Sequence, residues 1–381
     1  MTKIYIIRHA QAEGNIYRRA QGQYDGGVSP KGRLQIEALA ERFRRERIDA
    51  LYSSDLRRAV QTAGAITKYH DLTPRTDPRL REWAIGVWED VPFGNLEYAE
   101  PEQMYNFNND PAAWHAEGGE PWAALQKRMR EAVAEIAARH PDQTVACVSH
   151  GVAIRALLAD ILGVPSKKIP TLPHGDNTSV SLLEAEGGTL RAAWCNDAAH
   201  LSGGLSTFAR QSWWQDSGRP DPNNVRFLRL DPGRYPSRYL DYYARTWKAV
   251  HGNLDGFHSA LYRDDAIAHV AACPDALVTI VRPDGEVVGI TELDTERFRE
   301  QGVGWICLCF VEEPYRRQLL GVQLVGHAVS VFRRLGLRYA RLNVFEGNAG
   351  AIKFYEACEF RTVGESEGVN GNRLLIMEKP L

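Results

Sequence analysis

The chain has 381 residues, 44% of them apolar and 25% charged, a composition typical of a globular protein long enough for two domains. Its 46 Lys and Arg residues nearly balance its 48 Asp and Glu residues, so the formal net charge is only −2. Because nucleic acids and anionic membranes attract strongly basic surfaces, we expect neither as a partner. With no signal-peptide pattern and no apolar run of membrane-spanning length, a cytoplasmic location is expected.

The six cysteines form no Cys-x-x-Cys pair and no regular framework, so buried free thiols are expected. Cys307 and Cys309 stand two apart on an expected strand, which would place both side chains on one face of a sheet. That position favours core residues over metal ligands. No spacing of ligand-type residues indicates a metal site, and we expect none.

In the first half of the chain, expected strands alternate with expected helices. The apolar run over residues 4–7 indicates a strand buried on both faces. Ser29 and Pro30 are typical of a helix start, with an N-cap followed by proline at the first helical position. Further strands are expected over 49–53 and 144–148, and further helices over 57–66, 128–139 and 152–162. This alternation predicts an α/β sheet with helices on both faces.

A change of composition separates the two halves. From about residue 197 to 224 the chain is rich in Gly, Ser, Pro, Asn and Asp and lacks helical or strand periodicity, which indicates a linker. We therefore expect a first domain over 1–202, a linker over 203–224 and a second domain over 225–381. Trp213 and Trp214 are unusual in a free tether, and we expect them to anchor the linker against a domain.

Three expected strands of the first domain end in residues suited to phosphate. Arg8 and His9 follow the first strand, Arg58 follows the second, and His150 follows a later one. In open α/β sheets the ligand site lies beyond the carboxyl ends of the strands, so these side chains should converge.

The chemistry of phosphoryl transfer requires such a set. The guanidinium forks of Arg8 and Arg58 can each bind two phosphoryl oxygens. A neutral imidazole is a strong nucleophile, and neighbouring arginines keep it neutral, so His9 is the candidate nucleophile. His150 would stabilise the transferring oxygens. Glu82 is the candidate proton donor to the leaving alkoxide, and could then activate water.

These residues stand in motifs that resemble those of the histidine phosphatase, or phosphoglycerate mutase-like, superfamily. The resemblance covers about the first 200 residues, and its blocks are IRHA, SSDLRRAVQTA, LREWAIGVWED, GGEPW and VSHGVAIRALL. It implies a three-layer αβα domain with a mostly parallel sheet, and metal-independent hydrolysis of a small-molecule phosphomonoester. By position it implies that His9 is phosphorylated, that Arg8, Arg58 and His150 bind phosphate, and that Glu82 donates the proton.

The resemblance also places Asn15 and Gln21 at the phosphate pocket. Two positions depart from the family pattern: Ala10 replaces the usual glycine, and Ala12 replaces a common hydroxyl residue. Neither change removes a catalytic group. The same residues can run a mutase reaction, but the larger insertion and the Trp-Asn typical of such mutases are missing, so hydrolysis is favoured.

Substrate specificity is expected to come from the segment between Trp83 and Gly119. This segment is dense in aromatic residues, which would form either a cap over the pocket or part of the core: Trp88, Phe93, Tyr98, Tyr105, Phe107 and Trp114. His174 is a further candidate for the pocket lining.

The second half resumes the pattern of strands and helices. Strands are expected over 225–230, 277–281, 286–292, 304–311, 340–345 and 373–378. Four helices are expected: one over 237–250, one that starts at 259, one that follows residues 315–321 and ends at about 334, and one over 348–358. Residues 282–285, Arg-Pro-Asp-Gly, are typical of a hairpin turn.

Two blocks of this half, VEEPYRRQLLGVQLV and LNVFEGNAGAIKFYEACEF, resemble the GNAT-type N-acetyltransferases. The resemblance implies an α+β domain with a mixed sheet that uses acetyl-CoA as co-substrate and an amine as acceptor. Loop amides and a helix N-terminus would hold the pyrophosphate. The residues implied at the acetyl-CoA site are Val311, Arg316, Arg317, Gln318, Leu319, Leu320, Gly321 and Asn348.

By the same resemblance, Tyr355 would protonate the departing CoA thiolate. Glu292 is the candidate general base. Leu319 stands where the family has the first glycine of its loop, which keeps a second hypothesis open: a substrate- or CoA-binding module without catalysis. The fusion itself suggests that both domains act in one pathway, on an amine-bearing phosphate ester.

Overall fold

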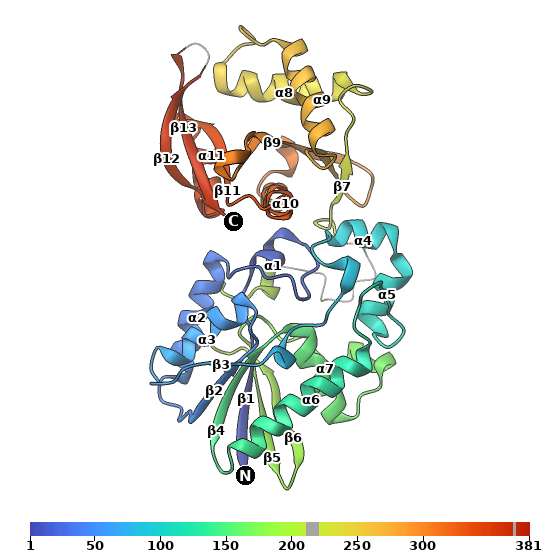
Figure 1. Ribbon diagram of the computed structural model, residues 1–381, viewed down its shortest axis with the longest axis vertical. Helices are drawn as coiled ribbons and strands as arrows, with labels where there is room; N and C mark the ends of the chain where they lie inside the picture. The colour runs from blue at the N-terminus through green and yellow to red at the C-terminus, as the bar shows by residue number, and fades with distance from the viewer. Residues whose placement is uncertain (211–220, 369–370) are drawn as a thin grey trace. The chain divides into compact units, whose positions relative to one another are not determined.

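The computed structural model describes residues 1–210, 221–368 and 371–381 (Figure 1). Its contacts divide the chain into two compact units: Met1–Val91 with Leu96–Pro220, and Pro92–Asn95 with Asp221–Leu381. Trp213 and Trp214 lie outside the described residues. Within the described ranges, no helix is both long and apolar enough to cross a membrane.

The first unit is built on a six-stranded sheet of order β3-β2-β4-β1-β5-β6. Its strands are β1 (Thr2–Arg8), β2 (Ala50–Ser53), β3 (Arg75–Thr76), β4 (Thr144–Ser149), β5 (Val180–Glu186) and β6 (Thr189–Asp197). The first four pair in parallel, whereas β5 and β6 form an antiparallel hairpin beside β1. Strand β1 therefore has a neighbour on each side, which fixes the position of its carboxyl end.

Helices cover both faces of this sheet, which confirms the expected three-layer αβα architecture (Figure 1). Helices α2 (Pro30–Phe43) and α3 (Arg57–Thr67) pack on one face through Leu39, Phe43 and Ile66. Helices α6 (Trp122–Arg139) and α7 (Gly151–Leu162) pack together and against β1. Shorter helices α1 (Glu13–Tyr17) and α5 (Pro101–Asn109) complete the unit, whereas the division between the two units falls within α4 (Phe93–Ala99), after Asn95.

The local signals explain some helix ends and miss others. Ser29 Oγ accepts a hydrogen bond from Gly32 N (3.1 Å), as expected of an N-cap. Helix α6 begins at Trp122, directly after Pro121 and six residues before its expected start. Strand β6, and with it the hairpin β5–β6, was not expected from the sequence, because β6 carries mixed polar and apolar residues without a clear alternation.

The aromatic residues of the segment after Trp83 belong mainly to a packed core. Trp83 and Trp88 are each 1% exposed, and Phe107 stacks on Trp83 with ring centroids 5.1 Å apart. Trp114 packs against both tryptophans. In contrast Tyr98 and Tyr105 are largely exposed.

The second unit is built on a seven-stranded mixed sheet of order β12-β13-β11-β10-β9-β8-β7. The strands are β7 (Arg226–Arg229), β8 (Leu277–Val281), β9 (Val287–Phe298), β10 (Val303–Val311), β11 (Tyr339–Phe345), β12 (Arg361–Glu367) and β13 (Arg373–Pro380). Helices α8 (Pro236–His251) and α9 (Ser259–Ala272) pack on one face, and α10 (Leu320–Arg334) packs on the other. Helix α11 (Ala349–Ala357) follows β11.

Strands β10 and β11 pair in parallel at their amino ends, from Val303 and Tyr339 to Trp305 and Arg341. A register shift in the pairing of β10 with β9 falls between Ile306 and Leu308. A β-bulge of this kind breaks the two-residue alternation of side chains.

The bulge corrects one expectation. Cys307 lies near Tyr239 and Tyr243 of α8, whereas Cys309 packs with Leu320 of α10. The two thiols therefore point to opposite faces of the sheet, although they stand two apart in the sequence. The expectation that they share a face was wrong because it assumed a regular strand.

Candidate active sites

The turn after β1, which carries His9, is fixed by hydrogen bonds from three neighbouring segments. His9 N donates to Ser149 O (2.9 Å), and Asn177 Nδ2 donates to His9 O (2.9 Å). Ala10 N donates to Thr62 Oγ1 (2.9 Å). Asn177 and Thr62 were not among the expected site residues, because their roles depend on contacts between segments distant in the sequence.

The imidazole of His9 is 4% exposed and held in one tautomer. Its Nδ1 lies 2.7 Å from Ala10 O. Because a carbonyl oxygen can only accept, Nδ1 carries the proton and Nε2 keeps its lone pair. Burial lowers the pKa of His9 well below 6.5, and the positive charges of Arg58 and Arg8 lower it further. This is the neutral form that nucleophilic attack requires.

Arg8 and Arg58 are both tied to backbone carbonyls. Arg58 is fully buried, and its two terminal nitrogens donate to Tyr24 O (2.7 Å) and Gly22 O (2.6 Å). Arg8 donates to Gly175 O (2.6 Å). In both arginines the buried Nε has no hydrogen-bond partner within the described part of the chain. A buried donor without a partner is costly, and a phosphoryl oxygen would satisfy it.

His150 lies at the end of β4, with its ring centroid 5.1 Å from that of His9. It is fully buried, and its Nε2 is 2.8 Å from Ser54 Oγ. Burial, together with the charge of Arg58 and the nearby His9, lowers its pKa well below 6.5. We therefore expect His150 to act through an N–H donor rather than as an imidazolium.

Glu82 sits at the N-terminus of α7. Its carboxylate accepts hydrogen bonds from Val152 N (3.1 Å) and Ala153 N (2.8 Å), where the helix has unpaired amides. Its charge reaches both Arg8 and Arg58. Arg128 of α6 holds the loop that carries Glu82, because its guanidinium donates a hydrogen bond to Glu82 O (2.8 Å).

Asn15 and Gln21 occupy different parts of the site. Asn15 Oδ1 accepts from Ala12 N (2.9 Å) and so braces the turn that follows His9. Gln21 lies against Gly14 and Gly26, where a β-carbon on either glycine would come within 2.6 Å of its side chain. Its buried Nε2 has no hydrogen-bond partner within the described residues, as for the two arginines.

Residues 205–208 also reach this site, although they fall in the segment expected to be a linker. Thr207 and Phe208 are 2% and 8% exposed. Thr207 N and Ser206 Oγ donate to the carboxylate of Asp176 (3.2 and 2.6 Å), and the ring of Phe208 lies 5.7 Å from the guanidinium carbon of Arg8. No motif predicted these contacts.

His174 is a neutral imidazole that accepts a hydrogen bond from Arg155 and lies near enough to Arg8 to be influenced by its charge. Arg155 Nη1 donates to His174 Nε2 (2.9 Å), and Arg155 also donates to Ile169 O (2.6 Å). Burial, with the charges of Arg155 and Arg8, lowers the pKa of His174 to about 3.

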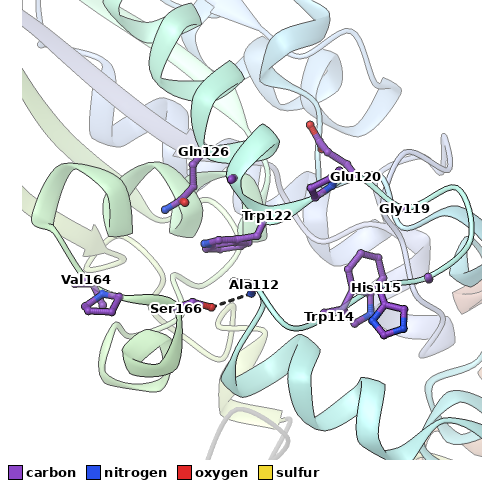
Figure 2. A pocket seen from close by; sticks show the side chains of 13 residues that line it. Ala112, Trp114, His115, Gly119, Glu120, Trp122, Gln126, Val164 and Ser166 are labelled. Atoms are coloured by element: carbon purple, nitrogen blue, oxygen red, sulfur yellow. Dashed lines mark hydrogen bonds between the residues drawn. The ribbon is translucent and has the colours of Figure 1, made fainter.

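A cavity of about 460 Å³ lies elsewhere in this unit, between α6 and the loop after α7 (Figure 2). Trp114 and Trp122 form part of its wall, and Ser166 accepts a hydrogen bond from Ala112 N (2.8 Å). Its acidic residue, Glu120, is paired with Arg128 (2.6 Å). The phosphate-binding groups are not among its lining residues.

The second unit carries the expected loop between β10 and α10. Arg317 and Leu319 adopt left-handed backbone conformations, with φ of 62° and 63°. A β-carbon disfavours this conformation, which explains why glycine suits the position of Leu319. The Leu319 side chain is 55% exposed, and α10 begins after it without a side-chain cap among the described residues. The first amides of α10 are therefore suited to an anion.

Asn348 and Tyr355 stand at the two ends of α11. Asn348 Oδ1 accepts from Ala351 N (3.0 Å) and caps the helix. Tyr355 is 9% exposed, and its hydroxyl lies beside the Cys309 thiol of β10. Burial and this contact raise the pKa of Tyr355 well above 10, so it holds its proton. Gly321 faces Phe354, which a β-carbon would meet at 3.1 Å.

Glu292 lies on β9 and is 1% exposed. Tyr239 Oη donates to one of its oxygens (2.9 Å), and His269 Nδ1 lies 2.8 Å from the other. Tyr239 and His269 were not expected to meet it.

An αβα unit with two histidines and two arginines at the carboxyl ends of its strands is the arrangement of a histidine-based phosphoryl-transfer domain. The chain belongs to the histidine phosphatase superfamily (branch 1), whose family model matches residues 4–198, just over half of its length. The acetyltransferase (GNAT) family model matches residues 238–360. One chain thus combines a histidine phosphatase domain with a GNAT domain.

The relatives of the first unit include phosphatases that are named for different substrates, and a probable mutase. Phosphoserine phosphatase 1 of Hydrogenobacter thermophilus is 33% identical over 186 residues, which are 49% of this chain and 88% of the relative. Glucosyl-3-phosphoglycerate phosphatase of Mycobacterium tuberculosis is 32% identical, over 56% of this chain and 92% of the relative. A probable phosphoglycerate mutase, GpmB, of Yersinia pestis is 34% identical, over 53% and 95%.

Among solved structures, Bacillus stearothermophilus YhfR is similar, with a TM-score of 0.51 and 31% identity. The match covers 53% of this chain and all of that one.

Phe208→Ala should weaken the binding of inorganic phosphate. The variant removes the aromatic face that holds the Arg8 guanidinium in place, an interaction of about 0.5–2 kcal/mol, which sets an upper limit of roughly 2- to 30-fold on the loss of affinity. The inhibition constant of phosphate against hydrolysis of p-nitrophenyl phosphate measures it. Phe208→Tyr keeps the ring and should retain the wild-type value; equal constants for Phe208→Ala and wild type would contradict the contact.

His174→Gln should make the first unit less sensitive to acid. The folded pKa of His174, about 3, lies below its unfolded value, so only the unfolded chain gains this proton as pH falls below 6.5. The contribution of His174 to stability is therefore present above pH 6.5 and lost towards pH 3, at up to about 1.4 kcal/mol per pH unit. Glutamine retains an acceptor for Arg155 and does not titrate. Urea unfolding followed by tryptophan fluorescence from pH 7 to 4 tests this, and equal slopes would contradict it.

Proposed function

We propose that the first unit hydrolyses a phosphomonoester through a phosphohistidine on His9. The observation that carries the proposal is a buried, neutral imidazole with Nδ1 bonded to Ala10 O, beside two arginines whose Nε donors lack protein partners. His9 Nε2 would attack phosphorus, forming the N–P bond as the ester P–O bond breaks. Arg8, Arg58 and His150 would stabilise the charge on the three phosphoryl oxygens.

In this proposal Glu82 handles the proton. In its protonated form it would donate to the departing alkoxide, and as the carboxylate it would then take a proton from water. The water oxygen bonds to phosphorus while the N–P bond breaks, which returns His9 and releases phosphate. The amides of Val152 and Ala153 hold the Glu82 carboxyl group at the start of α7 by hydrogen bonds.

The relatives suggest the first substrates to test. Phosphoserine and glucosyl-3-phosphoglycerate are named in two of them. Phosphoserine is also an amine-bearing phosphate ester, the class suggested by the fusion with a GNAT domain. The hypothesis that both units act in one pathway requires related substrates, and unrelated best substrates for the two units would contradict it.

His9→Ala should abolish phosphate release in the presence of a chelator, because the nucleophile is lost and the reaction needs no metal. The measurement is phosphate release from phosphoserine and from p-nitrophenyl phosphate, with acid-labile phosphate on the protein followed in stopped reactions. His70→Ala, a histidine replaced outside the site, should retain activity. Turnover by His9→Ala would show that the nucleophile is wrong, and transfer to an added alcohol in place of water would favour a mutase.

We further propose that the second unit transfers an acetyl group from acetyl-CoA to an amine. Acetyl-CoA, when bound, supplies the activated acetyl thioester. The uncapped start of α10, with the loop residues Arg317 and Leu319, would hold its pyrophosphate. Tyr355 keeps a proton on its hydroxyl for the departing thiolate, since its pKa is raised.

Calorimetric titration of acetyl-CoA into the full chain tests this proposal. Leu319→Gly removes the β-carbon from a left-handed residue, so we expect binding up to about tenfold tighter than wild type. Tyr355→Phe should bind equally but acetylate amines about 10²- to 10⁴-fold more slowly, whereas Tyr339→Phe should match wild type. Failure of both wild type and Leu319→Gly to bind would leave the second unit as a recognition module.

A further inference from the structure

Helix α9 and strands β9 and β10 bring together three side chains, of which only Glu292, the candidate general base, has an expected role. His269, Glu292 and Cys307 each offer one ligand atom, and these atoms lie within 4.8 Å of one another. Glu292 is 1% exposed, and the other two are partly buried. Residues 269, 292 and 307 have no motif spacing, and the β-bulge directs Cys307 towards the other two.

The surroundings of the cluster resemble the outer shell of a metal site. His269 directs Nδ1 at Glu292 Oε1 (2.8 Å), while its Nε2 lies 3.3 Å from Asp294 Oδ2. Tyr239 Oη donates to Glu292 Oε2 (2.9 Å), the oxygen turned away from His269. Metal-bound histidines almost always donate their second N–H to a carboxylate or carbonyl, and metal-bound carboxylates are themselves hydrogen-bonded. Both supporting contacts are present.

The charges around the cluster also favour a cation. Glu292 and Asp294 are two carboxylates with side-chain exposures of 2% and 13%, and His269 lies between them. Asp265 adds negative charge near Cys307, and Arg297 adds positive charge. Burial and the carboxylates raise the pKa of the Cys307 thiol well above 9, so the thiol keeps its proton unless a cation replaces it.

We propose that His269, Glu292 and Cys307 bind one divalent metal ion, with Zn²⁺ preferred. A set of one imidazole nitrogen, one carboxylate oxygen and one thiolate sulfur suits Zn²⁺ and excludes Mg²⁺ and Ca²⁺, which require oxygen ligands. The ion would tie α9 to the centre of the sheet, and three protein ligands would leave its fourth position open. This proposal does not depend on whether the second unit transfers acetyl groups.

Titration of Co²⁺ into the metal-free full-length chain, followed by absorption, tests the proposal. We expect one equivalent to bind with a thiolate-to-cobalt charge-transfer band, and Zn²⁺ to displace it. Cys307→Ser should lose the band, whereas Cys309→Ser, altered on the same strand but facing the other side of the sheet, should keep it. Asp294→Asn should weaken binding about 10- to 100-fold, as expected for an outer-shell carboxylate.

Two results would overturn the proposal: a wild-type chain without the band, or a band that survives in Cys307→Ser. A wild-type chain without the band would mean that Tyr239 and His269 only hydrogen-bond to Glu292, which agrees with the expectation that Glu292 is a general base. Circular dichroism of the metal-free variants controls for folding, and His269→Gln, which should also lose the equivalent of Co²⁺, gives a second reading if Cys307→Ser unfolds. Phosphate release, measured on the same samples with a chelator, should stay unchanged and so separates this site from the first unit.

Discussion

In the first unit, an imidazole must stay uncharged while it lies buried beside two guanidinium groups. The same burial that lowers the pKa of His9 also requires the arginines to be satisfied, and backbone carbonyls of Tyr24, Gly22 and Gly175 meet most of that need. The loop that carries Gly22 and Tyr24 is also held by hydrogen bonds from its own amides to the Glu89 carboxylate. The sheet, the helices around it and the loops beyond its strands therefore form a frame that holds the guanidinium groups of Arg8 and Arg58 beside the neutral imidazole of His9.

The sequence predicted the parts of this frame that depend on local pattern. The strand before His9, the cap at Ser29 and the placing of Arg58 and His150 after strands follow from short motifs, and the structure brings these side chains together. The sequence did not predict the roles of Asn177 and Thr62, because these residues form hydrogen bonds with the turn at His9 and Ala10, which is distant from both in the sequence. Strand β6, and with it the hairpin β5–β6, was missed for a related reason: its residues alternate poorly, and its stability comes from pairing with β5.

In the second unit, too, features set by local sequence were predicted and those set by contacts between distant segments were not. Asn348 was expected to open a helix and does so, since capping is a local property. The left-handed conformation of Leu319 follows from a glycine position in a loop, which the resemblance indicated. The meeting of His269, Glu292 and Cys307 depends on one extra residue in a strand, and a bulge leaves no clear mark in a short apolar run.

The residues around Phe208 have a practical consequence for where this chain can be divided. The family match ends at residue 198, yet Thr207 is bonded to Gln35 and Phe208 lies against Arg8. A shortened protein that stops at the end of the match would lose the contacts of Thr207 with Gln35 and of Phe208 with Arg8. A phosphatase domain produced alone should therefore extend at least to Phe208, because Thr207 and Phe208 belong to the packing of the first unit.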